Sequence, residues 1–212
     1  MKNAFILFVI SLFCFTLFSY DCLAADSSFQ AYDILSAHVD IVVSENKDIN
    51  VAETIYVLNP KVLNPCFTYT IPLMTEHYTY TLSNVFVTDL SNQPAKFSTY
   101  THIPNKEFYV NIFPVTNDGL VYVVHYTLTP RSNQSSDFDH LLINLKNNSQ
   151  AYTYNELSFS ITMPKPFSPS MVQLVPEKYG NTLSSSLIKY NIKDSMITGS
   201  MSSKGANRNI AF

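Results

Sequence analysis

The chain has 212 residues, of which 46% are hydrophobic and 14% charged, and its formal net charge is −3. This composition is too apolar for a disordered chain. It also lacks the clearly basic balance of nucleic-acid-binding domains, so we expect no nucleic-acid partner. The length accommodates one domain, or two small ones that share an interface.

The first residues have the pattern of a sorting signal. Lys2 precedes an uncharged apolar run over 4–20, and Cys22 and Ala24 are small residues at the two positions that a signal peptidase reads. This pattern predicts a secretory signal peptide over 1–24, and hence an exported protein, periplasmic or secreted. The run is shorter than the roughly 20 residues that cross a bilayer core, so an uncleaved N-terminal anchor is the lesser alternative. No second long apolar run follows, and we expect no membrane span in the mature chain.

After the signal, apolar and polar residues alternate in short stretches that turn residues separate. Period-two alternation is typical of half-buried strands, and Asp118-Gly119 is typical of a hairpin turn. Strands are expected at 33–43, 49–58, 66–71, 78–89, 97–100, 107–113, 120–128, 138–145, 156–163, 171–175, 187–192 and 196–201. Many short strands at regular spacing indicate an all-β fold. We interpret the pattern as an antiparallel β-sandwich over 25–201, followed by a polar tail at 202–212.

Two features leave the all-β architecture open in detail. The Pro-rich stretch 164–169 is the best internal boundary, and it either separates two small β lobes or crosses between sheets. The final Phe212 raises a small outer-membrane β-barrel as an alternative. Such a barrel needs strands with a sustained apolar face for lipid, whereas Lys204 and Arg208 occupy alternate positions near the end of the chain. Prolines within several expected strands also disfavour the barrel.

Several motifs resemble a known family. Val51-Ala52-Glu53-Thr54-Ile55, the later Ile71-Pro72, the tyrosine-bearing stretch 121–126 and the strand that ends at Met163-Pro164 are similar to domain of unknown function 2207. That family is the extracytoplasmic N-terminal domain of a group of predicted membrane proteins. The resemblance implies a fold and a location outside the cytoplasm, and it implies no activity. Tyr69 stands where the family usually has Arg, and this chain lacks the transmembrane helices into which family members continue.

Two residues could carry chemistry on their own. Glu53 lies among Val51, Ile55 and Val57 on the face expected to point inward. A buried carboxylate must be paired, hydrogen-bonded or protonated, and we expect a structural partner, either a Lys or a Tyr hydroxyl. Cys66 is the only cysteine after the signal, so no internal disulfide can form. Its neighbours predict a small buried apolar residue rather than a catalytic thiol.

Two groups hold residue types that bind metals. His38 and Asp40 share one face of an expected strand, and Asp137, Asp139 and His140 form the densest group of possible ligands. Neither group has a recognised metal spacing, so exposed strand residues and a polar loop are the expected roles. Motifs for an activated nucleophile or a phosphate-binding loop are absent from the sequence. We therefore assign no catalytic, cofactor-binding or metal-binding residue.

These observations favour an exported, non-enzymatic binding or structural module of the cell envelope. Its partner is expected to be an envelope or extracellular protein, and exposed tyrosines such as Tyr100 and Tyr152 would suit an interface. One alternative is an extracytoplasmic metal-dependent or hydrolytic enzyme that uses Glu53 or the group at 137–140. The other alternative is the small outer-membrane β-barrel.

Overall fold

The computed structural model describes residues 34–57, 67–74, 79–102, 106–113, 120–131, 156–172, 177–178, 181–182 and 188–202. The expected signal peptide, the turn at 118–119, the strand at 138–145 and the tail beyond Ser202 lie outside these residues. The elements are β1 (Ile34–Val43), β2 (Ile49–Val57), β3 (Phe67–Pro72), β4 (Thr79–Thr88), β5 (Phe97–His102), β6 (Glu107–Ile112), β7 (Leu120–Arg131), β8 (Glu156–Thr162), a short 3₁₀ helix η1 (Pro169–Met171), β9 (Glu177–Lys178), β10 (Asn181–Thr182), β11 (Ile188–Lys193) and β12 (Met196–Ser202).

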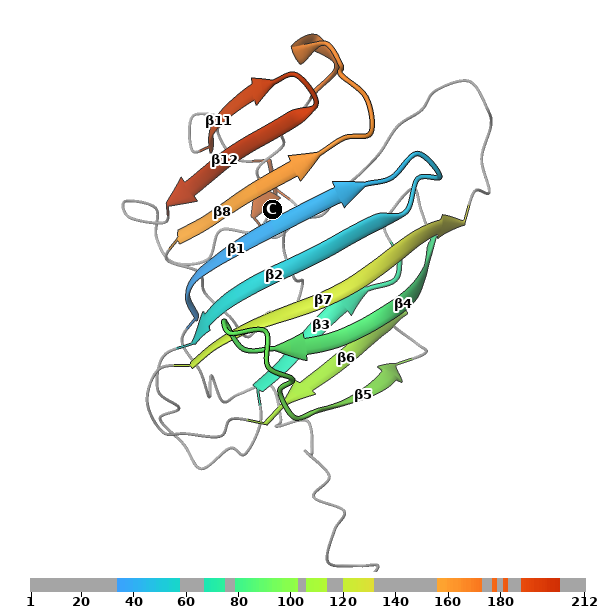
Figure 1. Ribbon diagram of the computed structural model, residues 1–212, viewed down its shortest axis with the longest axis vertical. Helices are drawn as coiled ribbons and strands as arrows, with labels where there is room; N and C mark the ends of the chain where they lie inside the picture. The colour runs from blue at the N-terminus through green and yellow to red at the C-terminus, as the bar shows by residue number, and fades with distance from the viewer. Residues whose placement is uncertain are drawn as a thin grey trace, which may run out of the picture.

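The strands form a large sheet, a smaller sheet and a short two-stranded pair. The large sheet has seven strands in the order β11-β12-β8-β1-β2-β7-β4, the smaller has the order β3-β6-β5, and β9 pairs with β10 (Figure 1). The all-β prediction is confirmed. The expectation of purely antiparallel pairing is corrected at one place, because β1 and β8 pair in parallel. A parallel pair needs a long connection between its strands, and most of the chain lies between these two.

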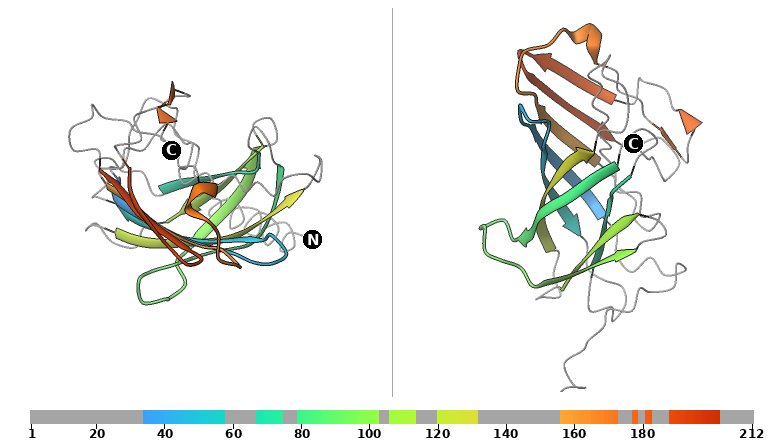
Figure 2. Two further views of the ribbon diagram at one scale, coloured as in Figure 1. Left: turned by 90° about the horizontal axis from the view of Figure 1, so that it is seen from above. Right: turned by 90° about the vertical axis from the view of Figure 1, so that its right-hand side faces the viewer.

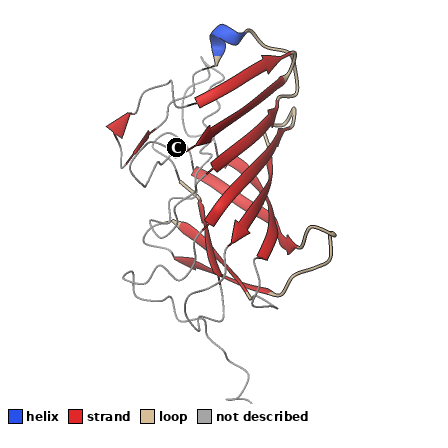
Figure 3. Cartoon of the chain, turned by 90° about the vertical axis from the view of Figure 1, so that its left-hand side faces the viewer, coloured by secondary structure: helices blue, strands red, loops and turns tan. Residues whose placement is uncertain are grey.

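The two larger sheets face each other as a sandwich. The seven-stranded sheet is curved, and the three-stranded sheet lies on its concave side (Figure 2). The core between them contains Ile41, Ile55, Phe67, Val110 and Val124, each at most 2% exposed. Strands make up nearly all of the regular structure in the described residues, where the one helical turn stands at one end of the molecule (Figure 3). Within the described residues, no helix has both the length and the apolar character needed to cross a bilayer.

The alternation read from the sequence identifies the inward faces of the central strands. In β1 the residues Ala37, Val39, Ile41 and Val43 are all buried, and the positions between them face outward. The same alternation holds in β7, where the inward side chains include Tyr122, Val124 and Tyr126. Successive side chains of a strand point to opposite faces, so the buried residues of a strand show which face each of its remaining residues occupies.

Two irregularities have local causes. In β4 the pairing with β7 shifts between Ser83 and Phe86, and Asn84 there has a φ of 54°. This bulge explains why Leu82 and Val85, which both pack against the core, are three residues apart instead of two. At the end of β7, Pro130 pairs only with β4, because the β2 ladder stops at Leu128. The missing proline N–H therefore falls on a free edge, where a strand tolerates it.

The Pro-rich stretch 164–169 leads from β8 toward η1, and β12 afterwards pairs with β8 in the same sheet. The strand expected at 171–175 does not begin there, since Met171 ends η1 and Val172 is not in a strand. The remaining residues of that expected strand lie outside the described part of the chain. Pro169 stands at the start of η1, where its fixed φ favours a helical turn over a strand.

Candidate functional site

A polar cluster lies in the core between the two sheets. Glu53 on β2 is 3% exposed, and its cross-strand neighbours are Val39 and Val124. The hydroxyl of Tyr69, on β3 of the opposite sheet, donates a hydrogen bond to Glu53 Oε2 at 2.5 Å. Tyr126 on β7 lies beside this pair, with its hydroxyl 3.4 Å from that of Tyr69. The inward position expected for Glu53 is confirmed, and one partner of its carboxylate is a tyrosine hydroxyl.

This cluster is closed to solvent. Burial and the nearby Glu53 carboxylate raise the pKa of Tyr126 well above its ordinary value, because both disfavour a phenolate there. Tyr122 lies on the same inward face of β7, and burial raises its pKa as well. Glu53, Tyr69 and Tyr126 are thus buried together between the two sheets.

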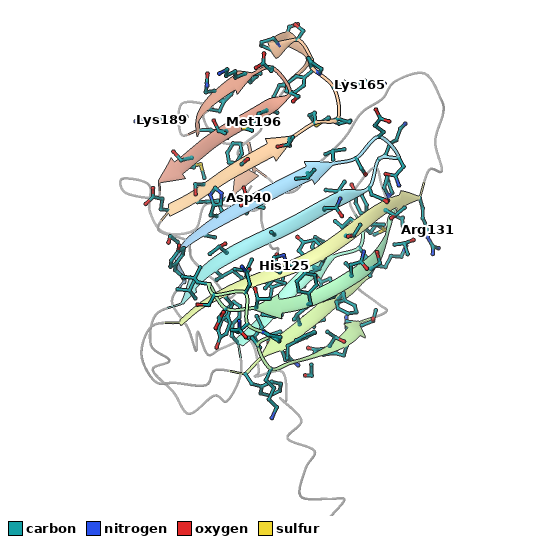
Figure 4. The ribbon with its side chains drawn as sticks, in the orientation of Figure 1. Asp40, His125, Arg131, Lys165, Lys189 and Met196 are labelled. Atoms are coloured by element: carbon teal, nitrogen blue, oxygen red, sulfur yellow. The ribbon has the colours of Figure 1, made fainter. Side chains whose placement is uncertain are left out.

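A second polar group lies on the outward, convex face of the large sheet. His38 and Asp40 on β1 point to this face, and Ser158 on β8 stands directly opposite His38 in the parallel pair. His38 Nδ1 is 2.7 Å from Ser158 Oγ, and His38 Nε2 is 3.1 Å from Asp40 Oδ1. The side chains of His38 and Asp40 are 40% and 52% exposed. Figure 4 shows Asp40 on the face of the sheet turned toward the viewer.

The chemistry of the acceptors decides the proton positions in this group. A carboxylate only accepts hydrogen bonds, so His38 Nε2 carries the proton toward Asp40. The neutral ring then has a lone pair at Nδ1, which accepts the hydrogen bond that the Ser158 hydroxyl donates. A serine, a base and a carboxylate that orients the base are thus linked in one chain.

Sequence reasoning found only part of this group. The shared face of His38 and Asp40 follows from their spacing, whereas the approach of Ser158 does not, because it is 120 residues away. Alternation along 156–163 could have placed Ser158 and Ser160 on an outward face, but no local signal pairs β8 with β1.

A third group surrounds the edge strand β5. The ring of Tyr100, on β5, stacks on the ring of Tyr109, on β6, with centroids 4.7 Å apart and planes 5° from parallel. His102 meets Tyr109 edge-on at 6.2 Å, and the hydroxyl of Tyr109 donates to Glu107 Oε2 at 2.5 Å. Burial, and then the charge of Glu107, raise the pKa of Tyr100. Tyr100 is exposed, as expected.

β5 differs from the other three edge strands of the two larger sheets. β11 carries Lys189 and Lys193, β4 is bulged at Asn84, and β3 has four of its six side chains buried and ends in Pro72. Charged residues, bulges, prolines and burial of the edge strand by the rest of the protein all keep an edge from pairing with another chain. β5 has none of these, since five of its six residues are exposed and its register with β6 is uninterrupted.

The remaining candidates either lie outside the described residues or form no metal site. Cys66, Asp137, Asp139, His140 and Tyr152 all lie outside them. In the part of the chain that the structure describes, no three His, Cys, Asp or Glu side chains form a group that could hold a metal ion. His38 and Asp40 come together as a pair, and the third member of their group is a hydroxyl.

No family model matches the chain, and no curated protein matches it. Solved structures with some similarity include yeast LTA4 hydrolase in complex with bestatin, at 12% identity and a TM-score of 0.48, which covers 87% of this chain and 28% of that one. Another is an M1 zinc metallopeptidase from Deinococcus radiodurans, at 8% identity and a TM-score of 0.41, which covers 86% of this chain and 41% of that one. The chain spans less than half the length of either protein, and at this similarity no activity follows for it.

Proposed function

We propose that the protein is an exported binding module of the cell envelope, which recognises an envelope or extracellular protein by strand addition at β5. The observation that carries this proposal is the unprotected edge of β5, because the other three edge strands of the two larger sheets are protected. Strand addition needs free backbone groups for affinity and side-chain contacts for specificity, and Tyr100 and Tyr109 supply an aromatic surface beside that edge.

The hydrogen bonding of β6 shows which backbone groups of β5 are free to pair. The Phe113 amide donates to the Lys96 carbonyl, and these two residues continue the β5–β6 register. Because antiparallel pairing alternates, the N–H and C=O groups of Phe97, Thr99 and Thr101 point away from β6. An extended segment of a partner would form its ladder with these three residues.

The test uses a substitution that removes one edge donor without loss of a bond to β6. Thr99→Pro has this property, since proline is tolerated at an edge position whose N–H faces solvent. Thr99→Ala is the matched control. An affinity matrix that carries each purified protein is incubated with envelope extract. A partner retained by the wild type and by Thr99→Ala, but lost from Thr99→Pro, supports strand addition. No partner above background, or equal retention by Thr99→Pro, contradicts it.

Export belongs to the same proposal and has a separate test. The signal-like start of the chain and the resemblance to domain of unknown function 2207 support a location outside the cytoplasm. We expect the protein in the periplasmic or secreted fraction, with Ala25 as its first residue. A cytoplasmic protein that retains Met1 would contradict export and leave the β5 test unaffected.

A further inference from the structure

The relay of Ser158, His38 and Asp40 has no part in strand addition. It lies on the convex face of the seven-stranded sheet, whereas β5 belongs to the other sheet. Its geometry matches the general signature of an activated nucleophile, in which the nucleophile and its base are within hydrogen-bond reach and a third group orients the base. The distances of 2.7 and 3.1 Å both meet that criterion.

From this geometry we propose that Ser158 is a base-activated nucleophile that accepts the acyl group of a small ester. His38 Nδ1 takes the Ser158 hydroxyl proton as Oγ attacks the ester carbonyl carbon. The tetrahedral intermediate then expels the alcohol, which takes that proton from His38, and the acyl group remains as an ester on Ser158. Water attacks this ester with His38 again as base, and the acid departs while Oγ regains its proton.

Asp40 acts as a positioning residue in this scheme. Its carboxylate holds the proton on Nε2 and thereby keeps the lone pair of Nδ1 directed at Ser158. It also stabilises the imidazolium that forms during attack. No other charged side chain faces His38 from the adjacent outward positions of β2, which are Ala52 and Thr54.

The neighbouring strands supply polar groups for the developing oxyanion. β8 has a strand on each side, so its backbone N–H groups belong to the sheet ladders. Ser200 of β12 stands opposite Ser158, and Lys189 of β11 stands opposite Ser200 in the same outward row. Ser200 is thus the cross-strand neighbour of the nucleophile on the side away from His38, and Lys189 lies one strand farther along the same row.

The location of the relay limits the class of substrate. His38 and Asp40 are widely exposed on an open sheet face, and their immediate neighbours are small residues such as Ser160, Ala52 and Thr54. Directly beside the relay this surface offers little apolar area to bind a long acyl chain, and the nearest large exposed apolar side chain on β1 is Val42, beyond Asp40. The substrate is therefore an ester with a short acyl group, such as an acetyl ester.

The same strand contains an internal control for the experiment. Ser160 lies two residues from Ser158 on the same outward face and stands opposite Asp40, not opposite the imidazole of His38. The purified protein is incubated with an aryl acetate and, separately, with a fluorophosphonate probe that forms a stable adduct with activated serines. Mass spectrometry of the digested protein then gives the rate of modification at each serine, and circular dichroism confirms that each variant is folded.

The wild type should be modified at Ser158 and not at Ser160, and Ser158→Ala should abolish both the adduct and acetate release. His38→Ala and Asp40→Asn should each slow modification by on the order of 10²-fold, since general-base catalysis contributes at least that much. In Asp40→Asn the amide can donate to Nε2, which places the ring proton on Nδ1 and removes the base without loss of the side chain. Equal rates at Ser158 and Ser160, or full modification in His38→Ala, would overturn the proposal.

Discussion

Tyr69 and Glu53 join the two sheets of the sandwich through a hydrogen bond of 2.5 Å from a tyrosine hydroxyl to a carboxylate that is 3% exposed. The two residues come from β3 and β2, which belong to different sheets. Buried polar groups weaken a fold unless they are satisfied. The contact therefore makes the relative position of the sheets depend on a specific pair, beyond the non-directional packing around it.

The first prediction concerns this pair. Tyr69→Phe keeps the ring and removes the donor, so the Glu53 carboxylate loses a charge-assisted hydrogen bond inside the core. We expect a loss of about 1–3 kcal/mol in the free energy of unfolding, the usual cost when a buried polar group loses its partner. Denaturant unfolding of the purified protein measures it. Glu53→Gln should also lower the melting temperature, and an unchanged value in both variants would contradict a structural role for the pair.

A second prediction uses a neighbouring tyrosine as the contrast. The Tyr122 hydroxyl is buried on the same face of β7, and within the described structure it has no hydrogen-bond partner. Tyr122→Phe removes a buried hydroxyl that forms no hydrogen bond in the described part of the folded protein. The free energy of unfolding should therefore stay equal or rise by up to about 1 kcal/mol. The same denaturant series as for Tyr69→Phe checks this. A loss comparable to that of Tyr69→Phe would show that Tyr122 has a bonded role.

The residues that face the core could be predicted, because they follow from the local alternation of apolar and polar residues. Period-two alternation placed Val39, Ile41, Glu53 and Val124 on inward faces, and all four are buried. It also led to the expectation that Glu53 needs a partner such as a tyrosine hydroxyl. Strict alternation is interrupted in β4, because one extra residue at a bulge shifts the register of everything after it.

The pairing of strands could not be predicted in the same way. Ser158 meets His38 because β8 inserts between β1 and β12, an arrangement that joins segments 120 residues apart. The unprotected edge of β5 is also a property of strand order, because the sequence Phe-Ser-Thr-Tyr-Thr-His reads the same in a central strand as at an edge. Local alternation gives the face of a residue, and only the topology gives its neighbours.

The third prediction concerns Gly199, which stands opposite Phe159 in the β8–β12 pair. A Cβ at Gly199 would lie 2.3 Å from the Phe159 ring and 2.9 Å from the Lys189 carbonyl oxygen. The ring lies over the glycine, and the carbonyl belongs to the β11–β12 ladder. Neither group can therefore move away from an added Cβ without a cost in packing or hydrogen bonding. Gly199→Ala should destabilise the protein by about 1–3 kcal/mol, as overpacking of a core does.

The neighbouring outward residue on β12 is the control for that prediction. Ser200→Ala changes a partly exposed side chain and should shift the free energy of unfolding by no more than about 0.5 kcal/mol. Thermal and denaturant unfolding of both variants measure the difference in stability. Equal stability of Gly199→Ala and Ser200→Ala would mean that the Phe159 ring can move away, and that the close packing at Gly199 is not needed.

The last prediction is a pH dependence that arises at His125. This side chain stacks on Phe86 at 4.3 Å, with planes 10° apart, and its Nε2 is 3.4 Å from the Thr88 hydroxyl. The adjacent outward position on β2 is Ala52, so neither neighbouring strand places a charged group directly opposite the ring. Burial lowers the pKa of His125 below its ordinary value of 6.5, because it disfavours the charged form of the ring.

The sign of the effect follows from proton binding. Below pH 6.5 the unfolded chain protonates His125 more readily than the folded protein does, so protonation favours unfolding. The contribution of His125 is complete above pH 6.5 and is lost as the pH falls through the lower pKa of the folded state. We expect the free energy of unfolding, measured between about pH 5 and 8, to fall more steeply on acidification in the wild type than in His125→Gln. Glutamine keeps a polar side chain beside Thr88 but cannot titrate, so groups elsewhere in the protein cancel in the comparison. Parallel curves for the two proteins would show that the stacked ring is protonated as easily as one in water.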